Sequence, residues 1–348
     1  MKKLLLGVSV AMVLAGSVSA QDVHFTQYFT SPLTLNPAMT GLVAEDLRFA
    51  ANYRTQWSSV SPNPYITGTA SYDMAILKGK LPEGDALGIG LLIEYDKSGS
   101  GGLTNTDAGL SLAYHKALGR EKQHHISLGV QGMLVQKSID VNKLTFEDEY
   151  NPTTGIFNPN STGEKFASTA ISYPDFNAGI MYSGKIAEHA TAYAGYSYYH
   201  ITQPSENFLE GENSSIHNRQ TGYLGGSFDM NPNTVLYASA LYQSQASATE
   251  VMLGAAVGFI LNPGHDDEYV KNTIFYLGGW YRYGDAVAPY VAIEWSKMRV
   301  GVSYDVNVSG FTPATNGAGA YEISLTYFGR INKHERTPQY SWSCPKLW

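Results

Sequence analysis

The sequence predicts an all-β fold: a transmembrane antiparallel β-barrel of the outer membrane with about fourteen strands, flanked by N-terminal and C-terminal periplasmic segments. Apolar and polar residues alternate with a period of two through most of the chain, as in strands with two different faces. No apolar run after residue 20 reaches the roughly 17–25 residues of a spanning helix. Charged residues make up 15% of the chain, against about 25% in an average soluble domain.

The composition excludes several other classes of protein. Aromatic residues make up 12% of the 348 residues, which is too many for a disordered chain of net charge −7. A single cysteine cannot form an internal bridge, so the fold is not a disulfide scaffold. The isoelectric point of about 5.7 gives no basic footprint, so nucleic acid is not an expected partner.

Residues 1–20 have the pattern of a signal peptide. Lys2 and Lys3 form a positive start, Leu4–Leu14 is apolar, and small residues end the segment at Ala20. The mature chain is therefore expected to begin at Gln21. The alternative is an uncleaved membrane anchor, which the short apolar stretch disfavours.

Period-two segments recur through the rest of the chain. Many are about ten residues long, which is what a tilted strand needs to cross a bilayer. The segments lie near 46–57, 65–77, 86–95, 104–116, 124–136, 174–183, 189–200, 221–229, 234–243, 249–261, 273–283, 286–295, 298–305 and 319–328.

Charges within these segments fall on the less apolar phase of each strand. A charge facing lipid at the midplane costs about 2–4 kcal/mol for Arg or Lys, so this phase should face the barrel interior. These residues are Arg48, Arg54, Asp73, Glu94, Asp107, Glu250, Arg282, Glu294, Arg299, Asp305 and Glu322. Aromatic residues near strand ends are typical of an interfacial girdle: Tyr53, Trp57, Tyr95, Tyr198, Tyr199, Tyr283, Trp295 and Tyr327. A secreted β-sandwich or propeller shows the same alternation, but its water-facing side carries more Lys and Glu.

Loop lengths support the barrel independently. Long stretches at 137–173, 201–220 and 306–318 follow odd-numbered strands, whereas most links after even-numbered strands are short. Residues 262–272 are the exception. Outer-membrane barrels have long extracellular loops and short periplasmic turns. An even number of strands then predicts that both ends of this multi-pass chain lie in the periplasm.

The predicted domains are the signal peptide (1–20), an N-terminal periplasmic or plug segment (21–45), the barrel (46–330) and a C-terminal periplasmic tail (331–348). The segment 21–45 contains too many apolar residues for a solvated linker. Three placements stay open for it: a plug in the lumen, a lid at the periplasmic mouth, or a site for a partner. The tail is also aromatic, and Cys344 is predicted to be either a free thiol or part of an intermolecular bridge.

Short motifs at the two ends resemble those of a known family. They are Gln27-Tyr28, Pro32-Leu33, Asn36-Pro37-Ala38, Gly41, Tyr53-Arg54-Thr55-Gln56-Trp57, Ser71-Tyr72-Asp73 and the ending Cys344-Pro345-Lys346-Leu347-Trp348. Together they resemble the PorP/SprF family, in which Phe is more usual than Trp at the last position. The resemblance implies an outer-membrane barrel of the type IX secretion system of Bacteroidetes.

Such a barrel is expected to assist secretion or surface attachment of adhesin-like cargo, and gliding motility in some members, by binding proteins. The implied partners are outer-membrane lipid, other type IX secretion components and cargo with C-terminal sorting domains. The residues predicted to bind partners are Phe25, Tyr28, Phe29, Leu33, Asn36, Pro37, Cys344, Pro345 and Trp348.

The sequence gives little support for catalysis, so we expect no enzyme, no cofactor and no metal. Adjacent His124 and His125 point to opposite faces of a strand. The acidic loop His265–Glu268 fits a solvated turn better than a weak Ca²⁺ site. Ser111 and His115 are separated by about 13 Å along one strand, which is too far for a nucleophile and its base. The alternative function is a porin or small-solute transporter, because mixed lumen charges fit a sealed interior or a pore.

Overall fold

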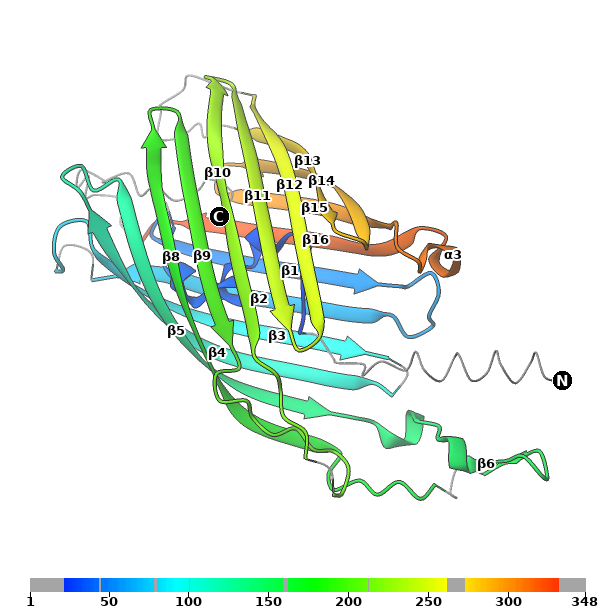
Figure 1. Ribbon diagram of the computed structural model, residues 1–348. Helices are drawn as coiled ribbons and strands as arrows, with labels where there is room; N and C mark the ends of the chain where they lie inside the picture. The colour runs from blue at the N-terminus through cyan, green and yellow to red at the C-terminus, as the bar shows by residue number, and fades with distance from the viewer. Residues whose placement is uncertain are drawn as a thin grey trace.

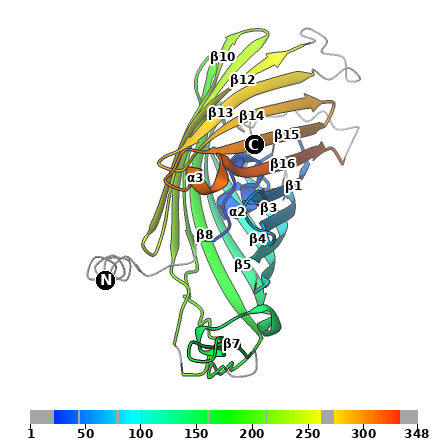
Figure 2. The same cartoon turned by 90° about the vertical axis from the view of Figure 1, so that its right-hand side faces the viewer.

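The structure is a computed structural model that describes residues 22–43, 45–77, 80–99, 101–158, 162–211, 213–261 and 273–331. Within these ranges, fourteen antiparallel strands form a closed barrel (Figures 1 and 2). The barrel strands are β1 (Leu47–Gln56), β2 (Tyr65–Ile76), β3 (Ala86–Ser98), β4 (Leu103–Leu118), β5 (His124–Ser138), β8 (Ala170–Ala187), β9 (Ala190–Tyr199), β10 (Arg219–Asn231), β11 (Thr234–Gln245), β12 (Ala248–Ile260), β13 (Ile274–Arg282), β14 (Ala286–Trp295), β15 (Met298–Asn307) and β16 (Ala318–Gly329).

This arrangement confirms the predicted fold class. Each predicted segment falls on one barrel strand, and each strand pairs with the strands before and after it in the chain. The last strand closes the barrel on the first, in a register that runs from Leu47 opposite Gly329 to Gln56 opposite Ala320. Closure leaves no unpaired sheet edge, which is the condition for a sheet to span hydrocarbon.

The two faces of the wall differ as the alternation predicts. On β4, Leu110 and Leu112 are exposed on the outer face, whereas Ser111 and His115 are buried on the inner face. The predicted inward-facing charges are buried or half-buried, and all but Glu94 and Asp107 have a described ion-pair partner. No helix in the described ranges is long and apolar enough to cross a membrane.

The two ends of the barrel carry different connections. One end, here called the loop end, bears the described residues of 139–158, 162–169, 200–211, 213–218 and 308–317. The loop-end segments include η3 (Val141–Lys143), η4 (Glu147–Glu149), β6 (Tyr150–Asn151), β7 (Ile156–Phe157) and α3 (Thr312–Thr315). Figure 1 shows β6 well beyond the barrel wall. The opposite end, here called the turn end, has short links such as 232–233 and 296–297. The exceptional segment 262–272 lies outside the described residues.

Two predictions need correction. Tyr199 is buried on the inner wall, 3% exposed, beneath Arg219, so it is not part of an outer girdle. The described chain also does not start and finish at one mouth. The backbone N–H of Asp22 donates to Gln245 at the loop end, and that of Ile331 donates to Asp46 at the turn end. An even number of strands predicts both ends at the same mouth only if the chain before β1 stays at the mouth where β1 begins. Here it runs through the lumen to the other mouth instead.

Candidate functional site

Residues 22–43, here called the lumen segment, run through the inside of the barrel. Every residue from Phe25 to Val43 is buried except Thr34, which is half-buried. The segment forms η1 (Tyr28–Thr30), α2 (Pro32–Leu35) and η2 (Pro37–Met39). Figure 2 shows α2 inside the ring of strands.

Local sequence explains these short turns. Proline has a fixed φ suited to a first helical position and lacks the N–H that would be unsatisfied there. Pro32 opens α2 and Pro37 opens η2 in this way. Asn36 caps η2, since its side-chain oxygen accepts the backbone N–H of Ala38 at 2.8 Å. The chain thus folds into compact turns that fit inside the barrel.

Three wall glycines make room for this cap. A Cβ added to Gly179 would lie 1.9 Å from Asn36 Oδ1, and one added to Gly129 would lie 2.3 Å from the Pro37 carbonyl carbon. A Cβ on Gly88 would lie 1.9 Å from the Thr40 carbonyl oxygen. These positions lie on β8, β5 and β3, so adjacent parts of the wall are shaped to admit the backbone of the lumen segment.

Hydrogen bonds in both directions join the lumen segment to the wall. The Asn36 amide donates to the carbonyls of Ile180 and Tyr196, at 3.1 and 3.3 Å. Gln131 Nε2 donates to the Leu33 carbonyl at 3.1 Å, and Ser197 Oγ donates to the Leu35 carbonyl at 2.7 Å. Because an unpaired buried carbonyl costs about 1–3 kcal/mol, these contacts favour this one position in the lumen.

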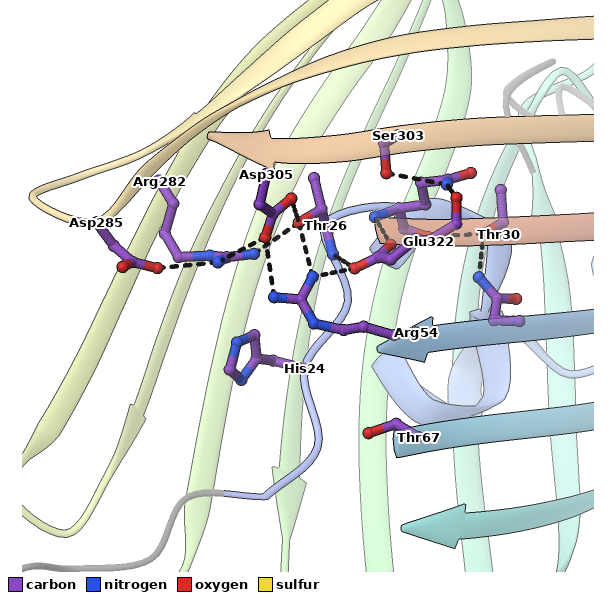
Figure 3. A network of polar contacts seen from close by, with 12 residues as sticks. His24, Thr26, Thr30, Arg54, Thr67, Arg282, Asp285, Ser303, Asp305 and Glu322 are labelled. Carbon is purple, nitrogen blue, oxygen red and sulfur yellow. Dashed lines mark hydrogen bonds and ion pairs between the residues drawn. The ribbon is translucent and has the colours of Figure 1, made fainter. Parts of the chain in front are cut away.

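A buried ion network holds the lumen segment near the loop end (Figure 3). The backbone N–H groups of Thr26 and Gln27 donate to the two carboxylate oxygens of Glu322, at 2.6 and 2.9 Å. Arg54 forms ion pairs with Glu322 and with Asp305, the latter at 2.9 Å. Glu322 therefore ties the lumen segment and β1 together on β16.

The network extends to β13. Arg282 donates to Thr26 Oγ1 at 2.6 Å and forms an ion pair with Asp305 at 3.1 Å. Thr26 Oγ1 in turn donates to Asp305 Oδ1 at 2.8 Å. Opposite charges thus neutralise one another around one buried threonine, which is how a protein tolerates ions at such depth.

An aromatic cluster packs beside this network. Phe29 lies 4.7 Å from the Trp280 ring and 5.4 Å from the Tyr290 ring, between ring centroids. Tyr28 Oη donates to Ser239 Oγ at 2.6 Å. Sequence reasoning missed this cluster, although aromatic residues on the charged phase of β13 and β14 were a usable signal for a filled interior.

Little space remains around the lumen segment. A cavity between its first residues and Arg219, Gln243 and Glu250 has a volume of about 20 Å³, room for about one water molecule. The described part of the lumen is therefore packed with side chains from the wall and from the lumen segment.

The two longest loops meet at the loop end. Phe166 and Leu209 form an isolated bridge, and the backbone N–H of Ala167 donates to the Phe208 carbonyl at 2.8 Å. Beyond this junction, β6 and β7 form a hairpin whose Ile156 is 62% exposed. Phe157 and Tyr150 are exposed beside it. The hairpin thus presents an apolar surface of the kind that marks interaction sites.

The profile described as "Type IX secretion system membrane protein PorP/SprF" matches residues 17–327. The chain belongs to the PorP/SprF family. A comparison with curated proteins finds no match.

Solved structures similar to this family member include transporters with barrel folds. The toluene transporter TbuX of Ralstonia pickettii is 10% identical to this chain. The match covers 87% of this chain and 94% of the TbuX chain, with a TM-score of 0.51. The toluene transporter TodX of P. putida is 11% identical over 85% and 93%, with a TM-score of 0.46. A FadL homologue of Pseudomonas aeruginosa is 10% identical over 84% and 92%, with a TM-score of 0.46. At this identity, the likeness to TbuX concerns the fold alone.

The predicted partner-binding residues fall into two groups. Phe25, Tyr28, Phe29, Leu33, Asn36 and Pro37 lie in the lumen segment and are buried in this family member. Cys344, Pro345 and Trp348 lie outside the described residues, as does His265–Glu268. A partner-binding role for both groups stays a prediction.

The catalytic candidates are occupied in structural contacts. His115 Nδ1 lies 2.6 Å from Ser127 Oγ, and its Nε2 lies 2.8 Å from the Thr40 carbonyl oxygen. Ser111 accepts a hydrogen bond from Gln131 at 2.9 Å. Within the described ranges, no three Asp, Glu, His or Cys side chains are grouped as metal ligands would be.

Proposed function

We propose that this barrel is a non-enzymatic component of the type IX secretion system that binds secreted cargo or other secretion components. Binding assists the export or surface attachment of adhesin-like proteins, and gliding where the cell glides. The proposal rests on two observations. Residues 22–43 fill the lumen and form hydrogen bonds with the barrel wall along their length, and the chain belongs to the PorP/SprF family. A packed lumen suits a binding protein better than a pore for solutes.

Orientation follows from the connections. Outer-membrane barrels have short periplasmic turns and longer external loops. We therefore assign the loop end to the cell surface and the turn end, where β16 finishes at Gly329, to the periplasm. In this orientation the β6–β7 hairpin faces outward, and the tail 331–348 starts in the periplasm, where the secretion machinery can reach it.

Two surfaces are then the candidates for partners. The hairpin offers Tyr150, Ile156 and Phe157 to a protein outside the cell. The ending Cys344-Pro345 and Trp348 offers an aromatic motif to a periplasmic component. The six candidates of the lumen segment contact a partner only if that segment leaves the barrel.

The proposal is tested by measuring surface delivery of a cargo protein in cells whose own gene for this barrel has been deleted and which produce an altered barrel instead. We expect that replacing residues 150–157 with a flexible linker, or removing residues 343–348, lowers delivery and leaves the amount of folded barrel unchanged. A substitution in the tight β11–β12 turn at the loop end, Ser247→Gly, is the matched control and should deliver normally. Normal delivery by both altered proteins would overturn these two binding surfaces.

Planar-bilayer recording separates this function from the porin alternative. We expect the intact protein to show no steady ion conductance, and a pull-down from detergent extract to recover other secretion proteins. Stable conductance without co-purifying secretion proteins would contradict the proposal and favour a porin.

A further inference from the structure

The N-terminal end of the described chain is bound in a socket at the loop end. Gln245, the last residue of β11, contacts Asp22 twice. Its Oε1 accepts the Asp22 backbone N–H at 2.8 Å, and its Nε2 donates to Asp22 Oδ1 at 3.0 Å. His200 Nε2 lies 2.5 Å from Asp22 Oδ2, and Arg219 Nη1 lies 3.4 Å from the same oxygen. Both carboxylate oxygens and the backbone N–H of one residue are thus recognised.

The socket residues are themselves held in place. His200 Nδ1 contacts Asp175 Oδ2 at 2.9 Å, and the His200 backbone N–H donates to Asn177 at 3.0 Å. His200 has a φ of +58°, a left-handed conformation that costs a non-glycine residue energy and is kept only when its surroundings impose it. Arg219 lies over the Tyr199 ring at 4.1 Å. Strands β8 to β11 therefore build one preformed site.

From this socket the chain crosses the barrel. Thr26 contacts β15 and β16 near the loop end, and Asn36 contacts β8 and β9 farther in. The Gly41 backbone N–H donates to Asp73 Oδ2 at 2.7 Å near the turn end. Residue 22 and residue 41 are thus at opposite mouths of the same lumen.

We propose that His200, Arg219 and Gln245 form a binding site for the N-terminal end of the processed chain, which thereby reaches the mouth that carries the long loops. The inference assumes removal of the signal peptide after Ala20 and rests on the orientation given with the proposed function, but it does not depend on any cargo or secretion partner. Residues 15–21 span at most about 25 Å when extended, less than the roughly 30 Å of a bilayer core. A precursor whose apolar stretch 4–14 is still in the inner membrane cannot place Asp22 in this socket, so the socket fills only after processing.

Epitope accessibility on whole cells tests the placement. A short epitope is inserted between Gln21 and Asp22, between Thr153 and Thr154 in the hairpin, or after Trp348. We expect the first two to bind antibody on intact cells and the third to bind only after permeabilisation. An N-terminal epitope that behaves like the C-terminal one, while the hairpin epitope is reached on intact cells, would overturn the proposal.

Hydrogen exchange on the full chain in detergent tests the socket itself. Gln245→Glu keeps the side-chain size but sets a carboxylate against Asp22, so exchange at residues 22–25 should rise by about tenfold or more. Exchange at residues 36–41 should stay unchanged, because Asp73 and the wall glycines still hold them. Asn213→Asp, which adds the same charge at an exposed residue of the same mouth, is the matched control. Equal exchange at residues 22–25 in Gln245→Glu and Asn213→Asp would show that Gln245 does not hold Asp22.

Discussion

Asp73 binds the guanidinium of Arg48 with both carboxylate oxygens, at 3.0 Å to Nε and 2.8 Å to Nη2, inside the wall near the turn end. The same Asp73 carboxylate accepts the Gly41 backbone N–H, and Arg48 Nη2 donates to the Met39 carbonyl at 3.1 Å. One ion pair of the wall therefore holds both the donor and the acceptor of the turn that ends the lumen segment. A residue predicted only to face the interior proves to fix what fills it.

Removing this carboxylate should destabilise the barrel strongly. Arg48 is 1% exposed, and Asp73→Asn would leave its charge buried without a counter-ion, a loss that costs about 3–5 kcal/mol. We expect a much lower urea midpoint for unfolding in detergent, followed by tryptophan fluorescence. Asp140→Asn removes the exposed partner of Lys143 and should change the midpoint little. Equal midpoints for the two variants would contradict a structural role for the Arg48–Asp73 pair.

The wall glycines give a second prediction, which concerns space. Gly129→Ala would bring a methyl group to 2.3 Å from the backbone of Pro37 and Ala38, so the lumen segment must shift. Overpacking of this kind costs about 1–3 kcal/mol, and exchange at residues 36–41 should accelerate. Gly222→Ala is the control, because nothing lies within 4 Å of its added Cβ. If Gly129→Ala and Gly222→Ala exchange alike, these glycines do not shape the site.

The wall was predictable from sequence because its physics is local. Lipid on one side and a polar interior on the other impose alternation on each strand, so strand positions, inward charges and the longest loops could be assigned residue by residue. Antiparallel pairing of neighbours then follows, since short links between consecutive strands permit little else. Leu110 facing out and Asp107 facing in are typical of the result.

The path of the lumen segment was not predictable in the same way. Its apolar composition required burial but was equally compatible with a plug, a lid or a partner. What fixes its position are contacts between residues far apart in sequence, such as the Asn36 amide with the Ile180 carbonyl and Thr26 with Glu322. No periodic pattern in the sequence encodes these long-range contacts. The one available signal was glycine at inward positions such as Gly129, where a strand otherwise carries a side chain.

The stability that the Asp22 socket contributes to the fold should depend on pH. Burial disfavours the charged ring of His200, but the Asp22 and Asp175 carboxylates outweigh burial and raise its pKa to about 9. Because this folded pKa exceeds the ordinary value of about 6.5, the stabilisation is complete below that value and is lost as pH rises through about 9. Burial would raise the pKa of Asp22, yet His200 and Arg219 hold it well below its usual range, so its contribution is lost only in acid.

Urea midpoints measured across the pH range check this dependence. We expect the urea midpoint of wild type to exceed that of His200→Gln most at mildly acidic pH, below about 6.5, and the gap to shrink as pH rises and to close above about 9. Titration of the His200 ring by NMR should report the raised pKa directly. A gap that stays constant from neutral to alkaline pH would show that the His200 charge does not hold the N-terminal end.

Removal of the lumen segment should convert the barrel into a conductor of ions. Buried charges such as Arg54, Arg282 and Glu322 would then line an open interior, since none of the fourteen barrel strands includes residues 22–41. We expect the protein lacking residues 22–41 to give steady single-channel currents in planar bilayers, and the intact protein to give none. Gly222→Ala, which alters the outer wall only, should stay silent. Equal currents from the intact and shortened proteins would mean that residues 22–43 do not seal the lumen.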